Sequence, residues 1–118
     1  MLIETEEGEV FDKLAIISVK IGCGDKESAK ISIDNFTELA SQVMKNIGEL
    51  RFNEIMDSEE FKELYLANLD TFNKVELAQK DNGLAKEVDL CNYNRYLKKK
   101  ELQKKFFNKE IKEIKIGY

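Results

Sequence analysis

The sequence predicts an all-α protein, an antiparallel bundle of about four helices in which the C-terminal helix is long. Apolar residues recur at spacings of three and four in four segments, which is the pattern of one face of an α-helix. The chain contains no proline, which suits long uninterrupted helices. Short connections separate the segments, and those at residues 22–26 and 81–83 contain glycine. Neighbouring helices are therefore expected to run antiparallel within a single domain over residues 1–118.

The first helix is predicted over residues 8–21, the most strongly patterned segment of the chain. Its apolar face consists of Val10, Phe11, Leu14, Ile17 and Ile21. Glutamates stand in its first turn and Lys20 in its last, as the helix dipole favours, and Gly22 and Gly24 end it. The β-branched residues Ile16 and Val19 leave a strand as the alternative.

The second helix is predicted to begin between residues 25 and 28. Its apolar face has a near-heptad spacing and consists of Ile33, Phe36, Ala40, Val43, Ile47 and Leu50. Such a narrow face can pack within the chain or against a second subunit. A homo-oligomer is therefore expected, with a dimer favoured. Residues 51–56 form a connection to which the pattern assigns no structure.

The third helix is predicted over residues 57–80, with Asp57 as the N-cap and Glu60 completing a capping box. Its apolar side consists of Phe61, Leu64, Tyr65, Leu69, Phe72 and Val75. The sequence Asp-Asn-Gly at residues 81–83 indicates a turn. The last helix is then expected over residues 84–113, with a possible bend at residues 98–100. Its sparser apolar stripe consists of Leu84, Val88, Cys91, Leu102, Phe106 and Ile111.

Composition excludes several classes of function. The chain has no histidine, which excludes histidine-based nucleophile pairs and histidine metal sites. Its two cysteines are too few for a disulfide framework and too far apart for a metal knuckle. No apolar run approaches the length of a membrane span, and no secretory signal pattern is present. We expect a cytoplasmic protein with no membrane partner, no cofactor, no metal and no catalytic residue.

Charge is distributed unevenly along the chain. Residues 86–118 carry ten Lys or Arg and five Asp or Glu, a net charge of +5 that leaves −9 on residues 1–85. The five lysines between Lys98 and Lys105 are flanked by Tyr93, Tyr96, Phe106 and Phe107, a pattern that can bind single-stranded nucleic acid. The favoured interpretation is a basic helix that lies against acidic ones, so nucleic acid is an unfavoured partner.

Polar residues fall on the apolar stripes at a few positions. Asn68 and Glu76 lie near the apolar face of the third helix, and Arg95 lies in the middle of the last stripe. Because an unpaired buried charge is costly, a Glu76–Arg95 ion pair is expected. Asp12 and Lys13 could join it. The favoured interpretation of the cluster is a structural ion pair that fixes the register of the helices. The alternative is a polar pocket that binds an anion or a sugar.

An acidic run, Glu59-Glu60-x-x-Glu63, resembles the first metal-binding motif of the all-α nucleoside-triphosphate pyrophosphatases. The second E-x-x-D motif of that family has no match here. Helix N-termini also collect glutamates because of the dipole alone, which is the favoured explanation.

Residues 8–20 read G-E-V-F-D-K-L-A-I-I-S-V-K. This segment resembles the opening of a small bacterial family of unknown function, whose pattern is G-E-x-x-D-K-L-x-I-x-x-x-K. Further positions resemble the family more loosely, namely Asn68, Phe72, Glu76, Asn94, Arg95, Lys98, Asn108, Glu110, Glu113, Lys115 and Tyr118. The family usually has tryptophan at the position of Phe72. The resemblance implies a helical protein without an established activity, in some cases encoded among bacterial surface-polysaccharide genes.

The sequence therefore favours an uncharacterised, self-associating interaction or structural module over an enzyme. The alternative is a helical domain, with or without a weak enzymatic activity, that binds a small ligand or anion through a buried polar cluster. The candidate ligand-binding residues are Asp12, Lys13, Asn68, Glu76 and Arg95.

Overall fold

The computed structural model of the chain describes residues 7–80 and 82–107. They form α1 (Glu7–Cys23), α2 (Lys26–Ile47), α3 (Glu49–Met56), α4 (Glu59–Ala78), a short 3-10 segment η1 (Asn82–Leu84) and α5 (Ala85–Phe106). No strand occurs in this part of the chain, so the predicted all-α class is confirmed. None of the helices within it is long and apolar enough to cross a membrane.

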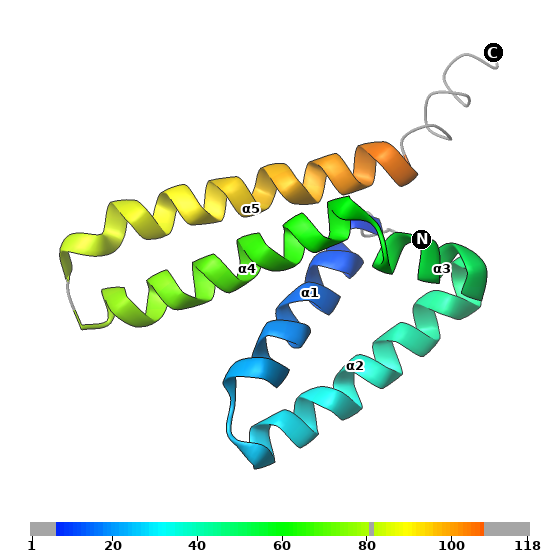
Figure 1. Cartoon of the computed structure of the whole chain (residues 1–118), viewed down its shortest axis with the longest axis horizontal. Helices are drawn as coiled ribbons and strands as arrows, with labels where there is room; N and C mark the ends of the chain where they lie inside the picture. Colours follow the sequence, from blue (N-terminus) through cyan, green and yellow to red (C-terminus); the bar gives the residue numbers. More distant parts are fainter. Residues whose placement is uncertain (1–6, 81, 108–118) are drawn as a thin grey trace, which may run out of the picture.

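The helices α4 and α5 form a long antiparallel hairpin, and α1 packs against both of them and against α2 (Figure 1). The register of the hairpin is set by Glu60 opposite Lys105, with 3.0 Å between the charged atoms, and by Glu63 opposite Lys98 at 3.1 Å. The helix α1 starts beside the hairpin and then diverges from α4 (Figure 1). Side chains of the C-terminal halves of α1 and α4 line a cavity where the two helices diverge, and we call this region the wedge.

Local capping explains where the helices begin and end. The carboxylate of Asp25 accepts a hydrogen bond from the backbone N–H of Ser28 (2.8 Å) and starts α2. Gly48, at φ 91°, ends α2 and begins α3, because glycine tolerates this conformation without steric cost. The expected N-cap at Asp57 is wrong by one residue. The side chain of Ser58 accepts from the N–H of Phe61 (3.1 Å), whereas Asp57 is the C-cap of α3 and its backbone N–H donates to the Asn53 carbonyl.

The segment to which the sequence pattern assigns no structure is the helix α3, so the described part of the chain has five α-helices where about four were expected. Phe52 and Ile55 of α3 are buried in the core. Arg51 donates to the carbonyl of Phe106 in the last turn of α5, and its guanidinium lies 5.5 Å from the centre of the Phe107 ring. A cation at the C-terminal end of a helix is favourable, so α3 both closes the core and caps α5.

The core lies where α1 crosses the hairpin. Its centre is Phe11, whose ring centroid lies 6.0 Å from that of Phe52, 6.4 Å from Phe61 and 6.2 Å from Phe107. The remaining buried members of this cluster are Leu14, Ala15, Ala40, Val43, Ile55, Leu64, Leu102 and Phe106. Aromatic rings at these separations stabilise beyond the area they bury.

The predicted apolar face of the second helix is confirmed in part. Ala40 and Val43 are buried, and Phe36 and Ile47 pack against the core while partly exposed. Ile33 is exposed, and Leu50 is an exposed residue of α3. The last helix is not broken at residues 98–100, since α5 is continuous from Ala85 to Phe106. The expected continuation over residues 108–113, including Ile111, lies outside the described residues.

The N-terminus of α1 rests directly on α5. The backbone N–H of Gly8 donates to the side-chain oxygen of the buried Gln103 (2.6 Å), and the Gln103 amide nitrogen donates to Glu7 (3.1 Å). This contact satisfies one of the N–H groups that a helix start leaves without a partner. A Cβ at Gly8 would stand 3.2 Å from both the Gln103 side chain and the Lys99 carbonyl.

Gly8→Ala is expected to lower the free energy of unfolding by about 1–3 kcal/mol, because the added methyl group overpacks this junction. Chemical denaturation followed by circular dichroism measures the change. Gly22→Ala is the matched control. Nothing lies within 4 Å of a Cβ at Gly22, so that substitution should be neutral or stabilise α1 by about 0.5–1 kcal/mol. Equal effects at the two sites would contradict the close approach.

Candidate functional site

Asp12 is a carboxylate inside the protein. It stands between the core residues Phe11 and Leu14 on α1, and only 4% of its surface is exposed. Removing a charged carboxylate from water costs several kcal/mol unless hydrogen bonds or an opposite charge replace the water. Its partners on the neighbouring helices therefore decide whether α1 can pack in this position.

The first partner is Asn68 on α4, which is equally buried. Its side-chain nitrogen donates to Asp12 Oδ1 (2.9 Å) and to the carbonyl of Leu64 in its own helix (3.0 Å). Both partners are acceptors, so the orientation of the amide is fixed. Asn68 thereby links α1 to α4 by a hydrogen bond to a charged group, which is among the stronger kinds.

The second partner is Arg95 on α5. Its Nη2 lies 3.8 Å from Asp12 Oδ2, and its side chain is 33% exposed. This distance is too long for a direct hydrogen bond but is within range of an ion pair. Asp12, Asn68 and Arg95 thus bring α1, α4 and α5 together in one polar cluster.

The structure separates the other two predicted residues from this cluster. Lys13 and Glu76 are both exposed, and the expected ion pair between Glu76 and Arg95 is wrong. The register of the hairpin explains why. Asp70 lies opposite Cys91, with 3.0 Å between Oδ2 and Sγ. Glu76 consequently stands beside the first turns of α5, well past Arg95.

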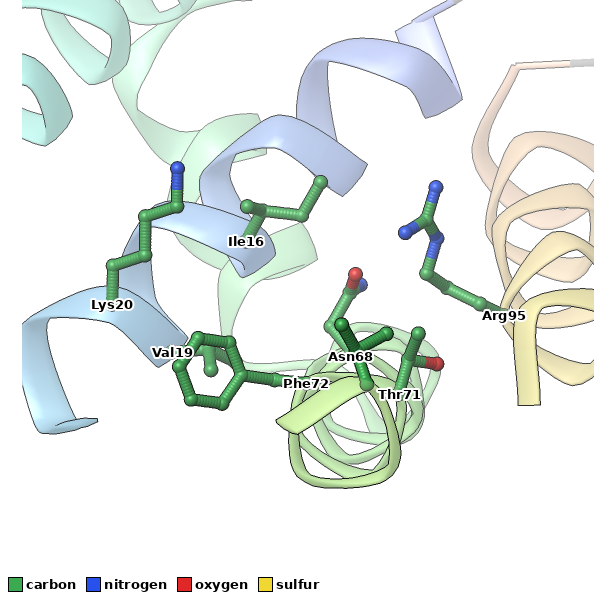
Figure 2. A pocket seen from close by; sticks show the side chains of 8 residues that line it. Ile16, Val19, Lys20, Asn68, Thr71, Phe72 and Arg95 are labelled. Carbon is green, nitrogen blue, oxygen red and sulfur yellow. The ribbon is translucent and has the colours of Figure 1, made fainter. Parts of the chain in front are cut away.

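A cavity of about 200 Å³ adjoins the cluster in the wedge between the three helices. Ile16, Val19 and Lys20 line it from α1, and Arg95 lines it from α5 (Figure 2). The lining from α4 consists of Asn68, Thr71, Phe72 and Val75. Figure 2 shows the Asn68 amide and the Arg95 guanidinium directed into the same space.

The lining combines apolar walls with a few polar groups. Ile16, Val19, Phe72 and Val75 form the apolar part. The hydroxyl of Thr71 donates to the Ala67 carbonyl (2.8 Å), which leaves its oxygen as an acceptor. Both charged residues of the lining, Lys20 and Arg95, are cations, and no carboxylate is among them.

Sequence reasoning missed part of this lining. Lys20 was assigned only to the helix dipole, and Val19 was noted only for its β-branched side chain. Thr71 does interrupt the apolar face of α4, three residues after Asn68, and that interruption was a usable signal. No sequence pattern could predict that Ile16, Val19 and Lys20 of α1 line the cavity, because their position depends on the angle at which α1 leaves the hairpin.

The acidic run does not converge on a shared point. Glu60 pairs with Lys105 and Glu63 with Lys98, and the hydrogen bond from Lys105 lowers the pKa of Glu60. Within residues 7–80 and 82–107, no three histidine, cysteine, aspartate or glutamate side chains gather as metal ligands would. The carboxylates serve instead to hold α5 against α4.

The basic stretch of α5 is largely engaged within the protein. Lys98 pairs with Glu63, Lys105 with Glu60, and Lys99 with Glu9 of α1. The hydrogen bond from Lys99 lowers the pKa of Glu9, and the bond to Glu63 raises that of Lys98. The favoured interpretation, a basic helix lying against acidic ones, is confirmed for these three lysines.

Asn68→Leu is expected to lower the free energy of unfolding by about 1–3 kcal/mol, because it leaves a buried Asp12 oxygen without its donor. Thermal and urea denaturation measure the change. Thr71→Val is the matched control on the same helix face. Its hydroxyl bonds only within α4, so this nearly isosteric replacement should cost less than about 1 kcal/mol. An equal loss of unfolding free energy in the two variants would mean that the Asn68–Asp12 hydrogen bond does not stabilise the fold.

No model of a known protein family, no curated protein and no solved structure matches this chain. A function for the cavity therefore has to follow from the residues that build it.

Proposed function

We propose that the wedge cavity binds a small molecule that carries one anionic group, a carboxylate, on an apolar body. The observation that carries this proposal is the charge of the lining. Arg95 and Lys20 are its charged members, both are cations, and the rest of the wall is mostly apolar. Small-molecule sites commonly combine apolar walls with a few polar groups that fix the orientation of the ligand.

Arg95 is the anchor of this site. Among the described residues its guanidinium makes one ion pair, to Asp12 at 3.8 Å, and no hydrogen bond. A guanidinium offers five N–H donors in a rigid fork that matches a carboxylate. Asp12 therefore holds Arg95 in place without using its donors, and the donors that reach the cavity stay available to a ligand.

The rest of the lining sets the size and polarity of the ligand. A volume of about 200 Å³ lies below the roughly 300–1,000 Å³ of pockets for drug-sized molecules, so the ligand is small. Ile16, Val19 and Phe72 offer a branched or aromatic group an apolar surface. Thr71 and Asn68 each add an oxygen that can accept a hydrogen bond beside Arg95, since their donors bond within the protein.

A carboxylate suits the site better than a phosphate. Sites for phosphate groups commonly use free backbone N–H groups at a helix N-terminus. All eight lining residues stand inside α1, α4 and α5, away from the first turns of these helices. Their backbone N–H groups are engaged within the helices. In addition, Asp12 offsets part of the charge of Arg95, which favours a singly charged ligand.

The lining supports binding rather than catalysis. It contains no carboxylate, cysteine or histidine that could act as a nucleophile or general base. Asn68, Phe72 and Arg95, three of the eight lining residues, are also among the positions that resemble the small bacterial family. The proposal therefore develops the ligand-binding alternative of the sequence analysis.

The proposal is tested by thermal denaturation in the presence of isovalerate and phenylacetate, with the neutral primary amides of both acids as paired controls. At ten times its dissociation constant a ligand stabilises the folded state by about 1.4 kcal/mol, which corresponds to a rise in Tm of about 5 °C. We expect a saturable rise with at least one acid and none with its amide.

Arg95→Met should abolish that rise, because it removes the anchor. Lys45→Met, which removes an equal charge from the exposed surface of α2, should leave it unchanged. An equal shift with acid and amide, or a shift that survives Arg95→Met, would overturn the proposal. The absence of a rise in Tm with both acids would also overturn the proposal.

A further inference from the structure

The outer side of α5 carries an apolar stripe that none of the described residues 7–80 and 82–107 covers. Leu90 is 68% exposed, Tyr93 61% and Leu97 38%. They follow one another at spacings of three and four, so they lie on one face of the helix. The opposite face of α5 contains Leu102 and Phe106, which are buried in the core. Contiguous exposed apolar side chains of this kind mark an interaction surface.

We propose that a second copy of the chain covers this stripe, with the two α5 helices packed antiparallel about a two-fold axis. An axis between Tyr93 and Asn94 places Leu90 of each copy opposite Leu97 of the other. A two-fold interface uses the same patch on both subunits, which this arrangement provides. The apolar centre is then formed by both copies equally.

Charge complementarity identifies the occupant. The same axis places Lys86 of each copy opposite Glu101 of the other. Two pairs of opposite charge therefore flank the apolar stripe, one at each end. Both residues are exposed. A parallel arrangement would instead place each of them opposite its own kind. Pairs of this kind at the edges of helix interfaces set the partner and the orientation.

Tyr93, which stands next to the proposed axis, packs against a neighbouring ring of its own copy. The rings of Tyr93 and Tyr96 stack with centroids 6.4 Å apart and an angle of 22° between their planes. The ammonium groups of Lys99 and Lys100 lie 5.7 Å and 5.6 Å from the centre of the Tyr96 ring. Side chains held in this way lose less freedom on association than mobile ones.

This surface differs from the second-helix face for which self-association was expected from the sequence. It is also independent of the wedge cavity, since Arg95 points from α5 into that cavity, whereas the stripe lies on the outer side of the helix. Ligand binding in the cavity and dimerisation through α5 can therefore be tested separately, and failure of one proposal does not affect the other.

The test is light scattering on a sizing column over a range of protein concentrations, with charge-exchange variants. Lys86→Glu alone and Glu101→Lys alone should each weaken the dimer about tenfold, because each places like charges opposite one another twice. The double variant should restore the dimer. Leu90→Glu should yield a monomer that is folded by circular dichroism.

Leu50→Glu is the matched control, because Leu50 on α3 is 89% exposed and lies outside the stripe. It should leave the dimer unchanged. A monomer at every concentration would overturn the proposal. A dimer that persists in Leu90→Glu would show that this face of α5 is not the interface. If the double charge variant does not restore the dimer that the single variants weaken, the antiparallel orientation is wrong.

Discussion

The buried carboxylate of Asp12 is the constraint on which the arrangement of the helices depends. It can enter the core only where α4 and α5 together supply a donor and a positive charge, and Asn68 and Arg95 do so from the two sides. The contact between Gly8 and Gln103 fixes the start of α1 against α5. Held at these two points, α1 leaves the hairpin at an angle and opens the wedge.

The same constraint gives the cavity its chemistry. A guanidinium that faced an apolar wedge without a counter-charge would be costly to bury, and one in a tight hydrogen-bonded pair would have few donors left. The 3.8 Å ion pair with Asp12 lies between these cases. The helix that carries Arg95 on its inner side also presents Leu90, Tyr93 and Leu97 to the outside. One helix thus serves the core, the cavity and the proposed subunit interface.

Much of the fold could be predicted from the sequence because it depends on local spacing. The four long helices follow from their apolar periodicity, and Asp12, Asn68 and Arg95 attracted notice because they are polar residues on or beside apolar stripes. The choice of Asp12 over Glu76 as the partner of Arg95 depends on the register of the hairpin, which is set by contacts such as Glu63–Lys98. Likewise the helix α3 is too short to be recognised from apolar periodicity. Its position depends on a contact between residues far apart in the sequence, Arg51 and Phe106.

The most direct test of this account is a double-mutant cycle that combines Asp12→Asn with Arg95→Met, read as free energies of unfolding. We predict that the double variant is less destabilised than the two single variants together, with a coupling energy of about 1 kcal/mol, since Arg95 is partly exposed. Additivity to within about 0.3 kcal/mol would contradict the account. It would mean that Asp12 does not hold Arg95, and that the position of the guanidinium in the cavity has another cause.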